Sequence, residues 1–186
     1  MLKEMVFPTV ENSSLIAVDL QERLMPAMSN GESILARAAI MVRGVAELGM
    51  DVIVTEQYPK GLGNTVPVIS TWLPDDTPVC EKTSFSIFQS ETFMTALASR
   101  KRQVLIFIGV EMHVCLLQSV LDARNAGYEV IVVADAVGAR CDRDKDLALA
   151  TARQAGAAVL SSEAVLFMLL RDAKNPHFKI VSSLIK

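Results

Sequence analysis

The chain has 186 residues, 51% of them apolar and 5% aromatic, and its 18 Lys and Arg against 21 Asp and Glu give a net charge of −3. This length predicts one domain over residues 1–186, with an aliphatic core that needs no disulfide or metal to hold it together. The charge balance argues against a nucleic-acid or anionic-membrane partner, and no apolar run approaches the length of a membrane span.

The compartment is predicted from the N-terminal residues and the cysteines. Residues 1–10 do not show the charged-then-apolar pattern of an export signal. Three cysteines is an odd number for a disulfide framework. We therefore expect reduced thiols and a cytoplasmic protein.

Short apolar runs rich in Val and Ile recur along the chain and are nearly continuous, which is typical of strands buried on both faces. Apolar residues at three- and four-residue steps between most of these runs predict helices, and a short closing helix is expected over residues 177–185. The expected strands are Leu15–Leu20, Val52–Thr55, Val79–Lys82, Val104–Val110, Glu129–Ala134 and Ala157–Leu160.

Three joints between a helix and the next strand have the same form. Each predicted helix runs into Gly49, Gly127 or Gly156, and a strand follows two or three residues later. Glycine accepts the left-handed conformation that closes a helix. Repeated joints of this kind predict βαβ crossovers and an open parallel sheet. The Pro- and Gly-rich segment 58–78 does not fit this pattern, and it is expected to be a lid or an interface element.

Polar residues follow the predicted strands at their carboxyl ends, where open parallel sheets bind ligands. Asp19 ends the first strand and Lys82 ends the third, although neither charge has a packing reason to be there. Cys115 lies just after the fourth strand, at the start of a helix whose positive end favours a thiolate. A lone cysteine is more often a small core residue. A carboxylate and an ammonium converging on the thiol would make it a nucleophile.

The other two thiols are expected to be structural. Cys80 lies inside the third predicted strand, where packing is the simplest role. Cys141 begins a helix, but Asp142, Asp144 and Asp146 surround it with negative charge that opposes a thiolate.

Two segments resemble the isochorismatase-like cysteine hydrolases: Thr55–Gly63, TEQYPKGLG, and Gly109–Cys115, GVEMHVC. The resemblance covers essentially the whole chain and is greatest to the isochorismatase domain-containing branch. It implies an α/β, three-layer α-β-α Rossmann-like fold with a six-stranded parallel sheet in the order 3-2-1-4-5-6. It also implies a triad in which Asp19 is the general base, Lys82 stabilises the thiolate and Cys115 is the nucleophile.

The same resemblance implies a non-proline cis peptide between Val110 and Glu111. In that family the bond directs the N–H of Glu111, together with that of Cys115, at a developing oxyanion. Metal-dependent nicotinamidases of the superfamily use a cluster of the form Asp-x-His-x-x-His, whereas this chain has only His113 and His177. We therefore expect no metal and no other cofactor.

Five residues near the strand ends are candidates for lining a substrate pocket. The candidates are Gln21, Gln57, Tyr58, Phe85 and Phe88. For Gln57 and Tyr58 the alternative is a role in starting the long loop, and for the two phenylalanines it is ordinary core packing. Gly61-x-Gly63 lacks the third glycine and the lysine of nucleotide-binding loops, so no nucleotide is expected.

Together these features predict a metal-independent cysteine hydrolase. It would cleave a C–N bond other than a peptide bond in a small amide or acyl compound, through a thioester on Cys115. One alternative is isochorismatase-type vinyl-ether hydrolysis, for which the acid–base aspartate matters and a cysteine is not needed. Another is a non-catalytic oligomeric binding or scaffold protein. The resemblance further implies a homo-oligomer.

Overall fold

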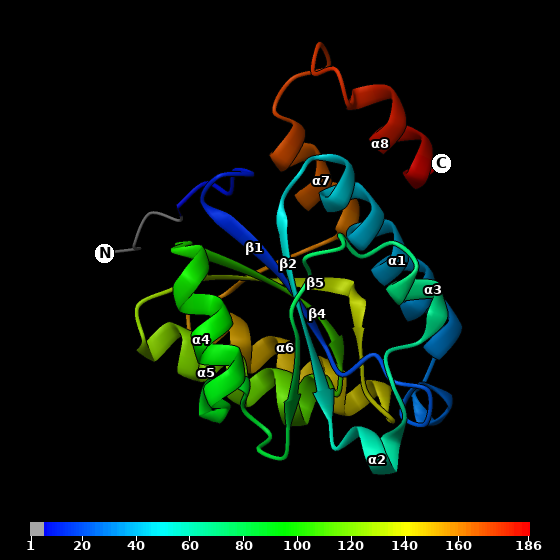
Figure 1. The fold of residues 1–186 in the computed structure, drawn as a ribbon, viewed down its shortest axis with the longest axis vertical. Coiled ribbons are helices and arrows are strands. Elements are labelled where there is room, and N and C mark those ends of the chain that lie inside the picture. The colour runs from blue at the N-terminus through cyan, green and yellow to red at the C-terminus, as the bar shows by residue number, and fades with distance from the viewer. Residues whose placement is uncertain (1–5) are drawn as a thin grey trace.

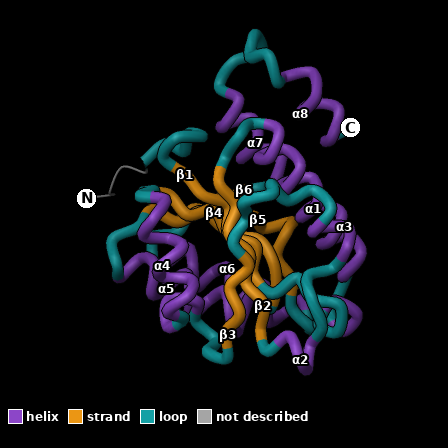
Figure 2. Tube along the Cα trace, viewed as in Figure 1, coloured by secondary structure: helices purple, strands orange, loops and turns teal. Residues whose placement is uncertain are grey.

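Six parallel strands form one sheet in the order β3-β2-β1-β4-β5-β6, which confirms the expected α/β topology (Figures 1 and 2). The computed structural model describes residues 6–186. The strands are β1 (Ser13–Val18), β2 (Asp51–Gln57), β3 (Val79–Lys82), β4 (Val104–Val110), β5 (Glu129–Gly138) and β6 (Ala158–Leu160).

Helices cover both faces of the sheet and so give it three layers (Figure 1). The α-helices are α1 (Gly31–Glu47), α2 (Pro59–Leu62), α3 (Pro67–Ser70), α4 (Glu91–Arg100), α5 (Leu117–Asn125), α6 (Asp142–Gln154), α7 (Ser162–Leu170) and α8 (Phe178–Ile185). The shorter turns are η1 (Met25–Ala27), η2 (Ile87–Gln89) and the π-helical η3 (Met112–Leu116).

The core is divided by the sheet into two apolar layers, because successive side chains of a strand point to opposite faces. Leu15 and Ala17 of β1 pack with α1 and α7 on one face. Ile16 and Val18 pack with α4, α5 and α6 on the other face. This double burial explains why the central strands read as continuous apolar runs in the sequence.

Glycines have a specific role where the chain turns or approaches another strand closely. The three expected joints have positive φ at Gly49, Gly127 and Gly156. Gly109 near the end of β4 has φ of 118°, and a Cβ there would lie 2.0 Å from the carbonyl oxygen of Val18. The close approach of β4 to β1 near the carboxyl ends of these strands therefore requires glycine at this position.

The long segment 58–78 is more ordered than its composition indicates. It contains α2 and α3, and Ile69 of α3 is fully buried in the core layer that contains α1. The buried carboxylate of Glu56 accepts hydrogen bonds from the N–H and the hydroxyl of Thr65, at 2.6 and 2.8 Å. This segment is therefore tied to the end of β2. No helix among residues 6–186 is both long and apolar enough to cross a membrane.

Candidate active site

A buried ion pair joins two of the residues predicted for the site. Asp19 follows β1, Lys82 ends β3, and the two side chains cross β2 to bring Nζ within 2.7 Å of Oδ2. Neither side chain is exposed to solvent. Asp19 has φ of 52°, a left-handed conformation that residues other than glycine adopt rarely. The chain therefore turns sharply at the point where it presents this carboxylate.

The remaining polar atoms of the pair also have partners. The second carboxylate oxygen of Asp19 accepts a hydrogen bond from the Thr55 hydroxyl at 2.7 Å. The Lys82 ammonium also donates to the side-chain oxygen of Gln57 at 2.6 Å and to the carbonyl of Ser84 at 3.3 Å. An ammonium has three protons to donate, and here each has an acceptor. The two charges are thus fixed in position by their surroundings.

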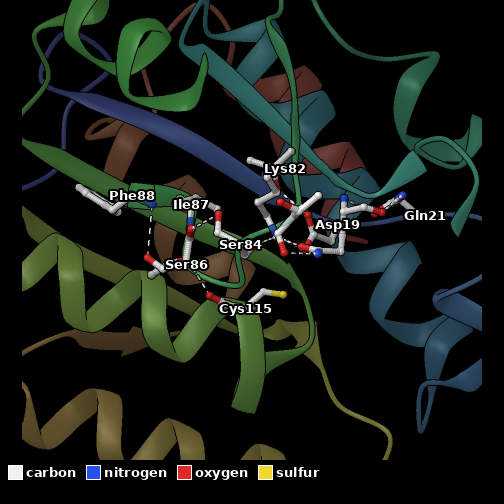
Figure 3. A network of polar contacts seen from close by, with 12 residues as sticks. Asp19, Gln21, Lys82, Ser84, Ser86, Ile87, Phe88 and Cys115 are labelled. Carbon is white, nitrogen blue, oxygen red and sulfur yellow. Dashed lines mark hydrogen bonds and ion pairs between the residues drawn. The ribbon is translucent and has the colours of Figure 1, made fainter. Parts of the chain in front are cut away.

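Cys115 lies in η3, and Figure 3 shows its side chain beside the group formed by Asp19 and Lys82. The residue is 7% exposed. The pKa of its thiol is raised to about 12, first by burial and then by the Asp19 carboxylate, whereas Lys82 lowers it. The structure therefore brings the three predicted catalytic side chains together.

The structure corrects the expectation that the thiol of Cys115 is ionised at rest. The sequence indicated that the start of a helix would ionise Cys115, but burial in a mostly apolar layer favours the neutral thiol, and a carboxylate faces it. At neutral pH the resting site therefore holds a protonated thiol beside a buried ion pair. Burial is a tertiary property, so the position of Cys115 at a helix start could not reveal it.

A hydrogen-bonded connection links the nucleophile segment to the loop after Lys82. The Ser119 hydroxyl in α5 donates to the carbonyl of Cys115 at 2.5 Å and accepts from the N–H of Ile87 at 3.1 Å. The Ser86 hydroxyl donates to Asp122 of α5 at 2.6 Å. The backbone on both sides of the site is therefore held together by α5.

The Val110–Glu111 peptide bond is cis. Glu111 directly precedes η3, and its carboxylate pairs with the guanidinium of Arg140 at 2.7 Å. The use of the N–H groups of Glu111 and Cys115 as an oxyanion hole stays a prediction.

The pocket candidates lie in different places. Gln21 is fully buried and its side chain binds backbone groups of Gln57 and Gly63, so it supports the chain and does not face a cavity. Gln57 contacts Lys82, and Phe85 is 54% exposed. The ring of Phe88 packs against Phe93 and Tyr128, with centroids 5.8 and 5.9 Å apart, which is the core packing given as the alternative for this residue.

A cavity of about 450 Å³ opens beside the backbone of Lys82. Tyr58 is the pocket candidate that lines it, together with Lys60, Ser84, Glu91 and others. Cys115 is not among its lining residues. The cavity therefore adjoins the ion pair from the edge-strand side of the sheet.

Within residues 6–186, no group of three or more His, Cys, Asp or Glu side chains is arranged to hold a metal ion. His113 lies 4.0 Å from Asp144, and His177 pairs with Glu47 at 2.8 Å. Both histidines thus face a single carboxylate.

Three supporting residues were not identified from the sequence as members of the site. Thr55 and Ser84 hold the ion pair, and Ser119 holds the backbone of Cys115. The position of Thr55 at the end of β2, beside β1, was a usable signal because parallel neighbours end at one edge. Ser119 carried no such signal.

Comparison with known proteins shows which family the chain belongs to. The isochorismatase domain matches residues 13–164, a range that contains all three of Asp19, Lys82 and Cys115. The chain belongs to the isochorismatase family. It therefore has the hydrolase fold of that family, as the resemblance of its two motifs implied.

Individual relatives agree with this assignment. The chain is 38% identical over 174 residues to isochorismatase domain-containing protein 2 of Xenopus laevis, covering 94% of this chain and 83% of that protein. It is 37% identical to the solved MAR1 ribonuclease of Caenorhabditis elegans, with a TM-score of 0.92 and coverage of 97% and 92%. The YcaC protein of Escherichia coli, described as an octameric hydrolase of unknown specificity, shares the fold at 24% identity and a TM-score of 0.92, with coverage of 98% and 91%.

Proposed function

We propose that the protein is a metal-independent cysteine hydrolase that cleaves a small amide or acyl compound through a thioester on Cys115. The observation that carries the proposal is a fully buried Asp–Lys pair whose two charges act in opposite directions on the pKa of one buried thiol, that of Cys115. A buried charge pair costs desolvation energy, so it is a poor means of stabilising a fold. Beside a thiol it supplies a base and a cation.

The first step is proton transfer. Because the thiol has a pKa of about 12, it needs a base to react at neutral pH. Asp19 removes the proton, and the Lys82 ammonium stabilises the thiolate that forms. The sulfur then attacks the substrate carbonyl carbon, and the carbonyl π electrons move to its oxygen. The N–H groups of Glu111 and Cys115 stabilise that oxyanion.

Collapse of the tetrahedral intermediate breaks the bond to the leaving group, which takes the proton held by Asp19. Asp19, now ionised again, activates a water molecule that attacks the thioester. The acid is released and the thiol recovers its proton. Each proton removed by Asp19 is returned, so the cycle needs no other reactant.

The substrate class follows from size and charge. The cavity of about 450 Å³ beside the backbone of Lys82 is not lined by Cys115, so a substrate that uses it must extend past the ion pair to the thiol, and a space of this size suits a small molecule rather than a protein segment. The net charge of −3 does not favour a polyanionic nucleic acid. Ribonuclease is the name of a relative, and RNA is a substrate to be tested here.

We also propose a homo-oligomer located in the cytoplasm, and light scattering would measure its size.

The decisive experiment uses p-nitrophenyl acetate and a panel of small primary amides. The wild-type protein should release nitrophenol with a burst, and intact-mass and peptide analysis should locate the acetyl group on Cys115. Cys115→Ser should lose both signals and keep its circular dichroism. Cys141→Ser is the matched control because Cys141 is an exposed thiol, and it should behave as wild type.

The outcomes separate the alternatives. Full activity in Cys115→Ser would overturn thiol catalysis. Hydrolysis of isochorismate by that variant would place the protein with the vinyl-ether hydrolases, and cleavage of RNA by it would identify a nuclease. A wild-type protein whose Cys115 is never acylated by any of these compounds would support the binding or scaffold alternative.

A further inference from the structure

The Lys82 ammonium has two partners that the triad does not account for, the side-chain oxygen of Gln57 and the carbonyl of Ser84. Besides Asp19, it donates to the side-chain oxygen of Gln57 at 2.6 Å, the shortest of its contacts. The side chain of Lys82 is fully buried. A neutral amide oxygen therefore contacts the buried cation on which the thiolate depends.

Gln57 is held in this orientation from both ends. Its side-chain nitrogen donates to the carbonyl of Thr83 at 2.8 Å, which leaves the oxygen facing Lys82. Gln21 fixes its backbone, accepting from the Gln57 N–H at 2.7 Å and donating to the Gln57 carbonyl at 3.0 Å. The orientation of this side chain is thus determined before any substrate binds.

The charge count shows why an amide suits this place. At rest the ammonium faces one carboxylate, and after proton transfer it faces one thiolate and a neutral Asp19. A second carboxylate beside Lys82 would compete with the thiolate for the ammonium and would raise the pKa of Cys115. An amide orients the ammonium through a hydrogen bond and adds no net charge.

We propose that Gln57 is a positioning residue that holds the Lys82 ammonium between Asp19 and Cys115 without supplying a competing charge. It acts through Lys82 and does not touch the reacting atoms. This inference rests on the proposed function, because it assigns Gln57 a part in forming the Cys115 thiolate.

The test compares Gln57→Glu with Gln57→Leu, each in a Cys141→Ser background, and measures the rate of iodoacetamide alkylation at a fixed pH near neutral, with peptide mass spectrometry to separate Cys115 from Cys80. In Gln57→Glu the added charge should lower the alkylation rate of Cys115 about tenfold or more, and kcat with p-nitrophenyl acetate should fall about tenfold or more with little change in KM. Gln57→Leu adds no charge and removes the amide contacts with Lys82 and Thr83, so its alkylation rate should fall less.

This order distinguishes positioning from packing. Glutamate has the shape of glutamine and leucine does not, so a residue that only fills space would tolerate Glu better than Leu. Gln154→Glu is the matched control: it adds the same charge at the exposed last residue of α6, away from the site, and should leave the alkylation rate unchanged. Thermal unfolding of each variant confirms that the compared proteins are folded.

The alkylation rate is measured on the resting protein, so it does not depend on turnover. If the rate in Gln57→Glu equals that of wild type, or falls less than that of Gln57→Leu, the role of Gln57 is overturned even where Cys115 still forms an acyl-enzyme. If Cys115→Ser retains turnover, the proposed function fails, and the alkylation rates still decide whether Gln57 controls the Lys82 ammonium.

Discussion

Two ion pairs of the site have the same separation, and they differ in burial. Lys82–Asp19 and Arg140–Glu111 both have N–O distances of 2.7 Å. The side chains of the first pair are fully buried, whereas in the second pair Arg140 is 62% exposed and Glu111 15% exposed. Water and salt screen the second pair through its exposed arginine, while the buried charges are screened much less in their action on each other and on Cys115. The comparison teaches that burial, not distance, makes one pair part of the chemistry.

The largest effect is expected when the buried cation is removed. Lys82→Ala leaves the Asp19 carboxylate uncompensated, which should cost about 3–5 kcal/mol in the free energy of unfolding measured with urea. It also removes the group that lowers the pKa of Cys115, so the alkylation rate of Cys115 at a fixed pH near neutral should fall. Lys179→Ala, at an exposed position of α8, is the control.

An unchanged alkylation rate in folded Lys82→Ala would remove the lysine from the mechanism. Where this variant is too unstable to assay, Lys82→Met keeps most of the side-chain volume and gives the same readout.

A smaller effect is expected at Thr55, which contacts the other oxygen of the Asp19 carboxylate. Thr55→Val keeps the shape of the side chain and removes the hydroxyl that donates to Asp19. A hydrogen bond to a buried charge contributes about 1.5–3 kcal/mol, so urea unfolding should show a loss in that range and turnover should fall. Thr55→Ser retains the donor and should recover turnover; failure to do so would show that the methyl group matters more than the hydroxyl.

The smallest effect is expected at the exposed pair. Arg140→Ala should change turnover by less than about threefold, because solvent already screens its contact with Glu111. Added salt should reduce even that difference. A loss of activity as large as that of Lys82→Ala would break the comparison, because it would mean that an exposed arginine acts on the reacting groups.

Much of the fold was predictable because it follows from local rules. Continuous Val- and Ile-rich runs such as Val104–Val110 are what strands buried on two faces require, and Gly49, Gly127 and Gly156 close their helices with positive φ. Asp19 and Lys82 were also recognisable, since charged residues at the ends of apolar strands have no packing role.

The partners of those charges were not predictable, because they depend on side-chain directions and on burial. Gln21 was expected near the substrate and instead holds the backbone of Gln57. The ring of Phe88, in η2, packs against Phe93 of α4 and against Tyr128, which precedes β5. The raised pKa of Cys115 likewise results from the surrounding core, which no position in the sequence encodes alone.

One measurement separates a base-dependent thiol from a thiol already ionised: the rate of Cys115 alkylation at neutral pH in Asp19→Asn, read beside its turnover. Asp19 raises the pKa of Cys115, so its neutralisation should increase the alkylation rate, while the loss of the base should reduce turnover about 100-fold or more. An alkylation rate that stays or falls, together with wild-type turnover, would contradict the assignment of Asp19 as the base that activates Cys115.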